Sequence, residues 1–189
     1  MGLLSVLLGR NKLRKSNREQ FFSIATAAVS LSGRTDLRTL TKAGVVFNPV
    51  DSRFFKELDS ELKELLSISG RATGTLYDIK DDGYGTRWVV LEDRDFEDLV
   101  TTIHLVGETI TEHGFGDRLI AAVFGFEYDS KEVYWVYNIK RGKFYPLVLA
   151  GDKKRDNVVE MRLGALMEEE KVPVEGSLEQ WYALWGIPF

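Results

Sequence analysis

Residues 119–149, LIAAVFGFEYDSKEVYWVYNIKRGKFYPLVL, decide the fold class. They contain three runs rich in the β-branched and aromatic side chains that favour strands. The runs cover residues 119–127, 132–139 and 144–149. Asp129-Ser130-Lys131 and Lys140-Arg141-Gly142-Lys143 separate them, and connections this short join antiparallel neighbours. The stretch therefore predicts an antiparallel meander of three strands.

Helices and further strands are predicted before the meander from capping, periodicity and turn signals. The first is a helix that begins at the capping box Ser16-Asn17-Arg18-Glu19, and a strand at 44–47 follows it. A second helix is capped by Asp51 and ends at Gly70. A hairpin of residues 73–79 and 85–92 and a helix at 95–113 complete this part of the chain. The hairpin turn contains Asp82-Gly83, a strong turn signal.

Two segments follow the meander. Residues 156–169 fit a strand by the alternation of Val159, Met161 and Leu163, but their length and Glu-rich end favour a helix. Ser177-Leu178-Glu179-Gln180 is a second capping box, and it predicts a short C-terminal helix. We expect this helix to pack on the domain, because Trp181 and Trp185 carry large apolar surfaces.

The order of these elements predicts an α+β fold, an antiparallel sheet of five to six strands covered by helices on one face. It is similar, by analogy only, to the folds of secretion chaperones. We expect a basic, leucine-containing segment at 1–18 and one α+β domain at 19–189 with a docked C-terminal helix. The sequence leaves the strand order and the oligomeric state open.

The composition is that of a globular protein in a reducing compartment. The chain has 189 residues, 44% hydrophobic and 29% charged, with a net charge of −4. It has no cysteine, which excludes disulfides, thiol nucleophiles and cysteine-bound metals. No apolar run approaches the roughly 20 residues needed to cross a bilayer. We therefore expect a cytoplasmic protein, with peripheral contact at the inner face of the membrane as a further option.

Enzyme signatures are missing from the sequence. His104 and His113 are nine residues apart on one predicted helix, which is the wrong spacing for a zinc helix. We expect His104 to be a partly buried packing residue. The glycines of Gly114-Phe115-Gly116 follow a helix, whereas a phosphate loop precedes one. We expect no catalytic residue, no metal and no cofactor.

Basic residues cluster at two places in the second half of the chain. They are Lys140, Arg141, Lys143, Lys153, Lys154 and Arg155. One interpretation is that they are solvated turns, where reversing a charge costs little stability. The other is a binding surface for an acidic partner or phospholipid head groups. Nucleic acid is disfavoured, because Phe144 and Tyr145 lie within a strand and form no stacking platform.

The N-terminal segment also allows two interpretations. It contains five basic residues and no acidic one after a leucine-rich start. Its leucines could dock on the domain, or the segment could be an amphipathic anchor on an anionic membrane. The residues that would contact such a membrane are Leu3, Leu4, Leu7, Leu8, Arg10, Lys12, Arg14 and Lys15.

A second function class is a small-ligand-binding or enzymatic domain. Its pocket would be formed by Tyr84, Arg87, Trp88 and Asp156. The glycines and aromatic residues around the turn suit a pocket wall, but they suit a tight hairpin with packed aromatic residues better. A pocket with perturbed titratable groups would favour this class over an adaptor.

Several segments, in order along the whole chain, resemble the PspAB family, which is associated with phage shock protein A (PspA). They are residues 1–10, 82–88 (DGYGTRW), 114–116 (GFG), 140–146 (KRGKFYP), 155–157 (RDN) and 181–186 (WYALWG). The resemblance implies a non-enzymatic accessory or adaptor protein of a PspA-type envelope-stress system. The implied partners are a PspA-like coiled-coil protein or an HtpX-type membrane protease. It implies no catalytic or ligand residue.

Overall fold

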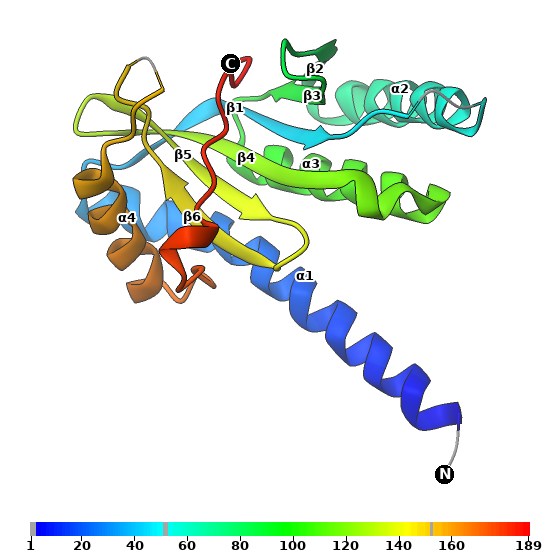
Figure 1. Cartoon of the computed structure of the whole chain (residues 1–189), viewed down its shortest axis with the longest axis horizontal. Coiled ribbons are helices and arrows are strands. Elements are labelled where there is room, and N and C mark those ends of the chain that lie inside the picture. The colour runs from blue at the N-terminus through cyan, green and yellow to red at the C-terminus, as the bar shows by residue number, and fades with distance from the viewer. Residues whose placement is uncertain (1–2, 51–52, 152) are drawn as a thin grey trace.

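Six strands form one antiparallel sheet at the centre of the protein, as a computed structural model shows (Figure 1). The structure describes the backbone of residues 3–50, 53–151 and 153–189, and the side chains of these residues except 3–17 and 53–55. The strands are β1 Arg38–Phe47, β2 Leu76–Asp81, β3 Arg87–Glu92, β4 Leu119–Tyr128, β5 Lys131–Asn138 and β6 Lys143–Leu147. The helices are α1 Leu3–Arg34, α2 Arg53–Thr73, α3 Phe96–Ile110 and α4 Asn157–Glu169. The sheet order is β2-β3-β1-β4-β5-β6, which confirms the α+β class.

The predicted meander is confirmed as β4, β5 and β6, paired antiparallel in sequence order. The first strand is longer than predicted, because β1 starts at Arg38 and not at residue 44. Its first half carries exposed side chains and no apolar pattern, yet it still pairs with β4 through a register shift between Thr39 and Ala43. Backbone pairing and the hydrogen bonds of the Arg38 guanidinium to nearby carbonyl groups hold this half, so the hydrophobic pattern could not predict it.

Helices cover one face of the sheet, and the main core lies between the two layers (Figure 1). α3 packs against β1 and contacts both α1 and α2. α4 lies beside β6 and contributes Leu163 and Met167 to the same core. Residues 156–169 are thus a helix, and the Asp156 carboxylate caps it by accepting a hydrogen bond from the Val159 amide at 3.2 Å.

The other face of the sheet is crossed by the C-terminal segment (Figure 1). The prediction of a helix from Ser177 was wrong, because only a 3₁₀ turn at Leu178–Gln180 forms. Side chains bind the carbonyl groups that a helix would use. Arg155 donates to the Trp181 carbonyl, and the Tyr145 hydroxyl donates to the Tyr182 carbonyl at 3.0 Å. The segment therefore lies on the sheet as extended chain.

Helix α1 begins at Leu3, so the prediction of a start at Ser16 was wrong. Residues 3–15 are mostly leucine, arginine and lysine, which are strong helix formers, and they extend the helix past the capping box. The N-terminal half of α1 projects beyond the sheet (Figure 1). The predicted cap of the second helix, Asp51, lies outside the described residues.

Candidate functional site

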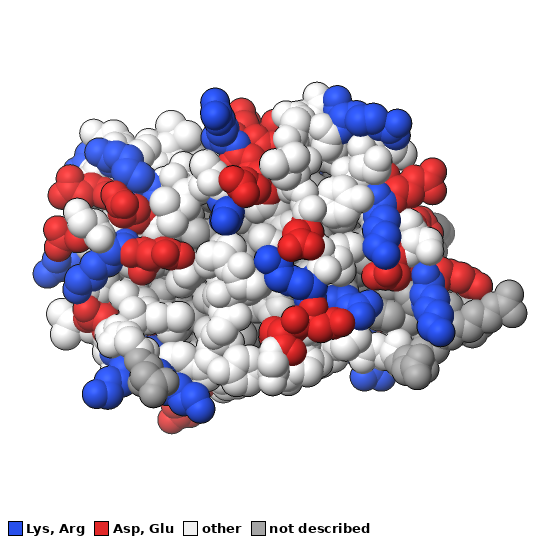
Figure 2. Space-filling view, turned by 90° about the horizontal axis from the view of Figure 1, so that it is seen from above, with Lys and Arg blue, Asp and Glu red and all other residues white. Residues whose placement is uncertain are grey.

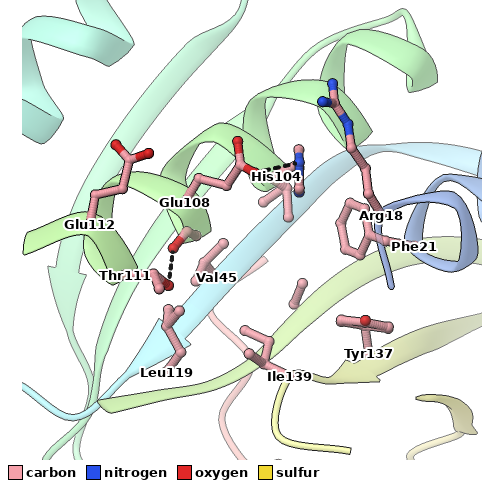
Figure 3. Close-up of a pocket in the computed structure, with 13 residues that line it drawn as sticks. Arg18, Phe21, Val45, His104, Glu108, Thr111, Glu112, Leu119, Tyr137 and Ile139 are labelled. Carbon is pink, nitrogen blue, oxygen red and sulfur yellow. Dashed lines mark hydrogen bonds and ion pairs between the residues drawn. The ribbon is translucent and has the colours of Figure 1, made fainter. Parts of the chain in front are cut away.

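A cavity of about 470 Å³ lies between α1, α3 and the sheet (Figure 3). Its size is within the range of small-molecule sites. Its apolar floor consists of Phe21, Val45, Ile103, Leu119, Ala122 and Ile139. Of these, all but Ile139 are at most 5% exposed, so the floor is sheltered from water. We call this space the helix–sheet cavity.

Two polar side chains lie in the helix–sheet cavity with hydrogen-bonding capacity left over. The Tyr137 side chain, from β5, is 7% exposed, and its hydroxyl has no hydrogen-bond partner in the described part of the chain. Burial raises the pKa of Tyr137, so the hydroxyl stays protonated at neutral pH. Its ring packs edge-to-face on Phe21, with the centroids 5.0 Å apart.

His104, from α3, is the second polar residue. Its Nε2 atom is buried and makes no hydrogen bond, although it lies 3.2 Å from Oε1 of Glu108. The two atoms are close enough for an ion pair if the imidazole is protonated, but they form no hydrogen bond. Burial lowers the pKa of His104, Glu108 acts in the opposite direction, and Arg18 lowers the pKa further. The imidazole is therefore neutral at neutral pH.

Charged side chains form the rim of the cavity. Arg18 comes from α1, Glu108 from α3 and Glu112 from the turn after α3. In Figure 3 their charged ends lie on the side opposite to Leu119 and Ile139. The hydroxyl of Thr111 is already used, because it donates to the Gly107 carbonyl at 2.8 Å. Among the described residues, the rim thus holds two acidic groups and one basic group around an apolar interior.

At the turn between β5 and β6, the predicted basic residues have two different environments. Lys140 and Lys143 are exposed, and within the described residues neither forms an ion pair. Arg141 is bound to the Glu175 carboxylate, which is buried. This hydrogen bond lowers the pKa of Glu175, so the pair stays charged over a wide pH range. Arg141 is therefore an anchor of the turn, although its side chain is 42% exposed.

The second basic group, Lys153, Lys154 and Arg155, also combines exposed lysines with an arginine that forms an ion pair. Lys153 and Lys154 are exposed on the loop after β6. The Arg155 side chain is only 18% exposed, and its Nε donates to Oε1 of buried Glu160 at 2.8 Å. The same guanidinium binds the Trp181 carbonyl. Arg155 therefore links α4 to the C-terminal segment, which leaves four of the six predicted basic residues open to a partner.

The N-terminal residues predicted to contact a membrane lie on α1, but their side chains are outside the described part of the structure. Membrane contact thus stays a prediction. None of the described helices is long and apolar enough to cross a membrane.

The four residues of the alternative pocket do not converge. Tyr84, Arg87 and Trp88 belong to the β2–β3 hairpin, whereas Asp156 follows β6. β1, β4 and β5 lie between β3 and β6, so β3 and β6 are roughly 19 Å apart at the usual strand spacing. Asp156 caps α4 and binds Lys131 at 3.1 Å. Each of the two groups has a local structural role.

The sequence did not predict the helix–sheet cavity. Its residues come from α1, β1, α3, β4 and β5, and no local motif joins them. His104 was predicted to be partly buried, which is confirmed, but its place in the wall of this cavity depends on the packing of α3 on the sheet. Among the described residues, no group of three or more histidine, aspartate or glutamate side chains could hold a metal ion.

Acidic side chains lie beside basic ones across the face shown in Figure 2. A protein that tracks a nucleic-acid backbone instead gathers its basic side chains in a stripe or patch. The face shown in Figure 2 therefore has mixed charge and no such basic stripe.

The fold and the cavity define a class: an α+β domain with one antiparallel sheet, helices on one face and a ligand-sized space beneath them. Neither the curated proteins nor the solved structures contain a match to the chain. The chain belongs to the PspAB family, described as PspA associated protein B, whose pattern matches residues 1–189. The match covers the whole chain, so the family includes both the domain and the N-terminal segment.

Proposed function

We propose that the protein is a non-catalytic adaptor of a PspA-type envelope-stress system. Family membership over the whole chain supports an accessory role beside PspA. The proposed partner is a PspA-like coiled-coil protein, or alternatively an HtpX-type membrane protease. The proposed place of action is the cytoplasm, with reversible contact to the inner face of an anionic membrane through the N-terminal part of α1.

The observation that carries this proposal is the exposure of Lys140 and Lys143 on a turn that internal hydrogen bonds hold. Gly142, between them, has a φ of 66°, in the left-handed region that favours glycine. Its amide donates to the Asn138 carbonyl at 2.8 Å, and Arg141 is bound to Glu175. The turn is therefore held from within, and the two exposed ammonium groups have no ion-pair partner among the described residues.

The position of the other exposed lysines suits an elongated acidic partner. Lys153 and Lys154 follow β6, while Lys140 and Lys143 precede or begin it. β6 has five residues, which span roughly 16 Å at the usual rise of a strand. An acidic helix lying along this edge of the molecule would meet both lysine pairs.

The proposal is tested by equilibrium binding of the purified chain to the PspA-like protein of the same host. We expect the double variant Lys140→Glu/Lys143→Glu to bind at least about tenfold more weakly, because like charges at an interface cost several kcal/mol. The control is Lys56→Glu/Arg71→Glu on α2, which changes the net charge by the same amount at exposed positions. Equal loss in both variants, or no loss in either, would contradict the proposed docking surface.

A further inference from the structure

β2 and β6 are the two edge strands of the sheet, and they differ in what covers them (Figure 1). At β6, the Phe144 amide donates to the Pro173 carbonyl and the Phe144 carbonyl accepts from the Glu175 amide, both at 2.8 Å. Within the described residues, no backbone hydrogen bond or β-bridge is made to the outer edge of β2. β2 also contains no proline, and its register with β3 has no bulge. An uncovered, regular edge strand is a template for pairing with another strand.

The main-chain groups at this free edge belong to Tyr77, Ile79 and Asp81. Just past the end of β2, the Asp82 amide donates to the Thr86 carbonyl at 2.9 Å, so residues 82 and 86 are a hydrogen-bonded pair. Hydrogen-bonded and non-hydrogen-bonded pairs alternate along an antiparallel ladder, so the even-numbered residues of β2 bond to β3. The odd-numbered residues therefore present their N–H and C=O groups to the free edge.

We propose that two copies of the chain pair through β2, antiparallel, with Ile79 of one copy opposite Ile79 of the other. A two-fold axis then passes between the two isoleucines, and Tyr77 lies opposite Asp81 of the second copy. These are the residues whose main-chain groups point outward, so each forms a hydrogen-bonded pair across the axis. The two sheets become one continuous sheet. The inference does not depend on the adaptor proposal.

The charges of β2 select this register. In it, Asp78 lies opposite Lys80 of the second copy, and Lys80 lies opposite Asp78. Both side chains are on the same face of the strand, 65% and 39% exposed, and only 3.2 Å apart within one chain. A slip of two residues sets Asp78 against Asp78 in one direction and Lys80 against Lys80 in the other. Opposite charges stabilise a strand pair and like charges destabilise it, so the strand is complementary to itself in one register.

The length of β2 limits the strength of the dimer. The strand has six residues, and small interfaces belong to weak or transient complexes. Pairing would also shelter part of Leu76 and Tyr77, which are 66% and 39% exposed. We expect a dissociation constant between about 10 µM and 1 mM. At the low-micromolar concentrations of an unfolding experiment the chain is then a monomer.

The dimer is measured by sedimentation equilibrium of the full chain over a series of concentrations. The variants are Asp78→Lys, Lys80→Asp and the double variant Asp78→Lys/Lys80→Asp. Each single variant sets like charges opposite one another at two places, so we expect dimerisation at least about tenfold weaker. The double variant exchanges the two charges and should return to within about threefold of the wild type. The single variants change the net charge in opposite directions, so an effect of net charge alone would not give this pattern.

Amide hydrogen exchange locates the interface independently. The amides of Tyr77, Ile79 and Asp81 should exchange more slowly at high protein concentration than at low. The amides of Asp78 and Lys80 bond to β3 and should be protected at both concentrations. The inference is overturned if the chain is a monomer at about 1 mM, if a single variant dimerises like the wild type, if the double variant fails to recover, or if the exchange of the three outward amides does not depend on concentration.

Discussion

Asp82 organises the β2–β3 turn with a single carboxylate. It accepts hydrogen bonds from the Tyr84 amide at 2.8 Å, the Thr86 amide at 2.9 Å and Nε1 of Trp88 at 3.0 Å. The Thr86 hydroxyl also donates a hydrogen bond to this carboxylate. Trp88 is only 1% exposed, so the carboxylate also satisfies a buried indole. The segment resembled a ligand site in the sequence because aromatic residues and glycines surround the turn, but these contacts explain the same residues structurally.

We predict that Asp82→Ala lowers the free energy of unfolding by about 1–3 kcal/mol, because the indole N–H of Trp88 is left without an acceptor. Urea unfolding measures the change. The control Asp78→Ala removes an exposed carboxylate of β2 and should stay within about 0.5 kcal/mol. Equal unfolding curves for Asp82→Ala and the wild type would mean that the turn does not depend on this carboxylate.

The same contribution should depend on pH. Burial acts to raise the pKa of Asp82, but the hydrogen bonds from Thr86, Trp88 and Tyr84 outweigh it and lower the pKa to about 2 from an ordinary 3.8. A folded-state pKa below the unfolded value stabilises the fold at pH values above the unfolded pKa. The difference between wild type and Asp82→Ala should therefore be constant above about pH 4 and shrink as the pH falls toward 2.

Arg155 and Lys154 are neighbours in sequence with different roles. We predict that Arg155→Glu lowers the free energy of unfolding by at least about 2 kcal/mol, because it breaks the bond to buried Glu160 and opposes it with a like charge. Lys154→Glu should stay within about 0.5 kcal/mol. Thermal or urea unfolding of the two variants measures the contrast. If both variants unfold like the wild type, Arg155 does not act as a link between α4 and the C-terminal segment.

At the scale of elements, the C-terminal segment shows what sequence patterns can and cannot predict. Its two tryptophans predicted an apolar segment that packs on the domain, and Trp181 is 8% exposed. The capping box predicted a helix, but Arg155 and Tyr145 take the carbonyls of Trp181 and Tyr182. Those partners lie 26 and 37 residues away along the chain, so no local pattern could reveal them.

The packing of this segment can be measured by truncating its tryptophans. We predict that Trp181→Ala destabilises the protein by about 3–5 kcal/mol, the usual cost of removing a large buried aromatic side chain. Its indole also donates to the Glu175 carbonyl at 2.7 Å. Trp185 is only partly buried, so Trp185→Ala should lower the free energy of unfolding by less. Unchanged melting of the Trp181→Ala variant would show that the segment is not held on the sheet.

Helix α1 combines a part that packs on the sheet with a basic N-terminal part. We predict that the full chain sediments weakly with vesicles that contain anionic lipid, since each basic residue near such a surface contributes about 1 kcal/mol. Raising the salt concentration should weaken the binding. Substitution of Arg10, Lys12, Arg14 and Lys15 by Gln should abolish it. Equal sedimentation with neutral and anionic vesicles, or none with either, would contradict the anchor.

At the scale of the molecule, the sequence predicted the fold class and the family, and both are confirmed. The antiparallel meander and α4 could be predicted because their signals are local. The helix–sheet cavity could not, because α1, α3 and three strands meet only through the sheet order. The anchoring role of Arg141 was missed because its partner, Glu175, lies 34 residues away along the chain. The link from Arg155 to the C-terminal segment was missed because the Trp181 carbonyl lies 26 residues away.

The central proposal is an adaptor whose exposed lysines meet an acidic partner, and the association rate tests it most directly. Rim charges act mainly on the rate of encounter. For Lys140→Glu/Lys143→Glu and the PspA-like protein, we predict an association rate at least about tenfold below wild type at low salt, with unfolding unchanged. The difference should disappear as the salt approaches 1 M, where screening acts within about 3 Å. Equal association rates at low salt would contradict the account.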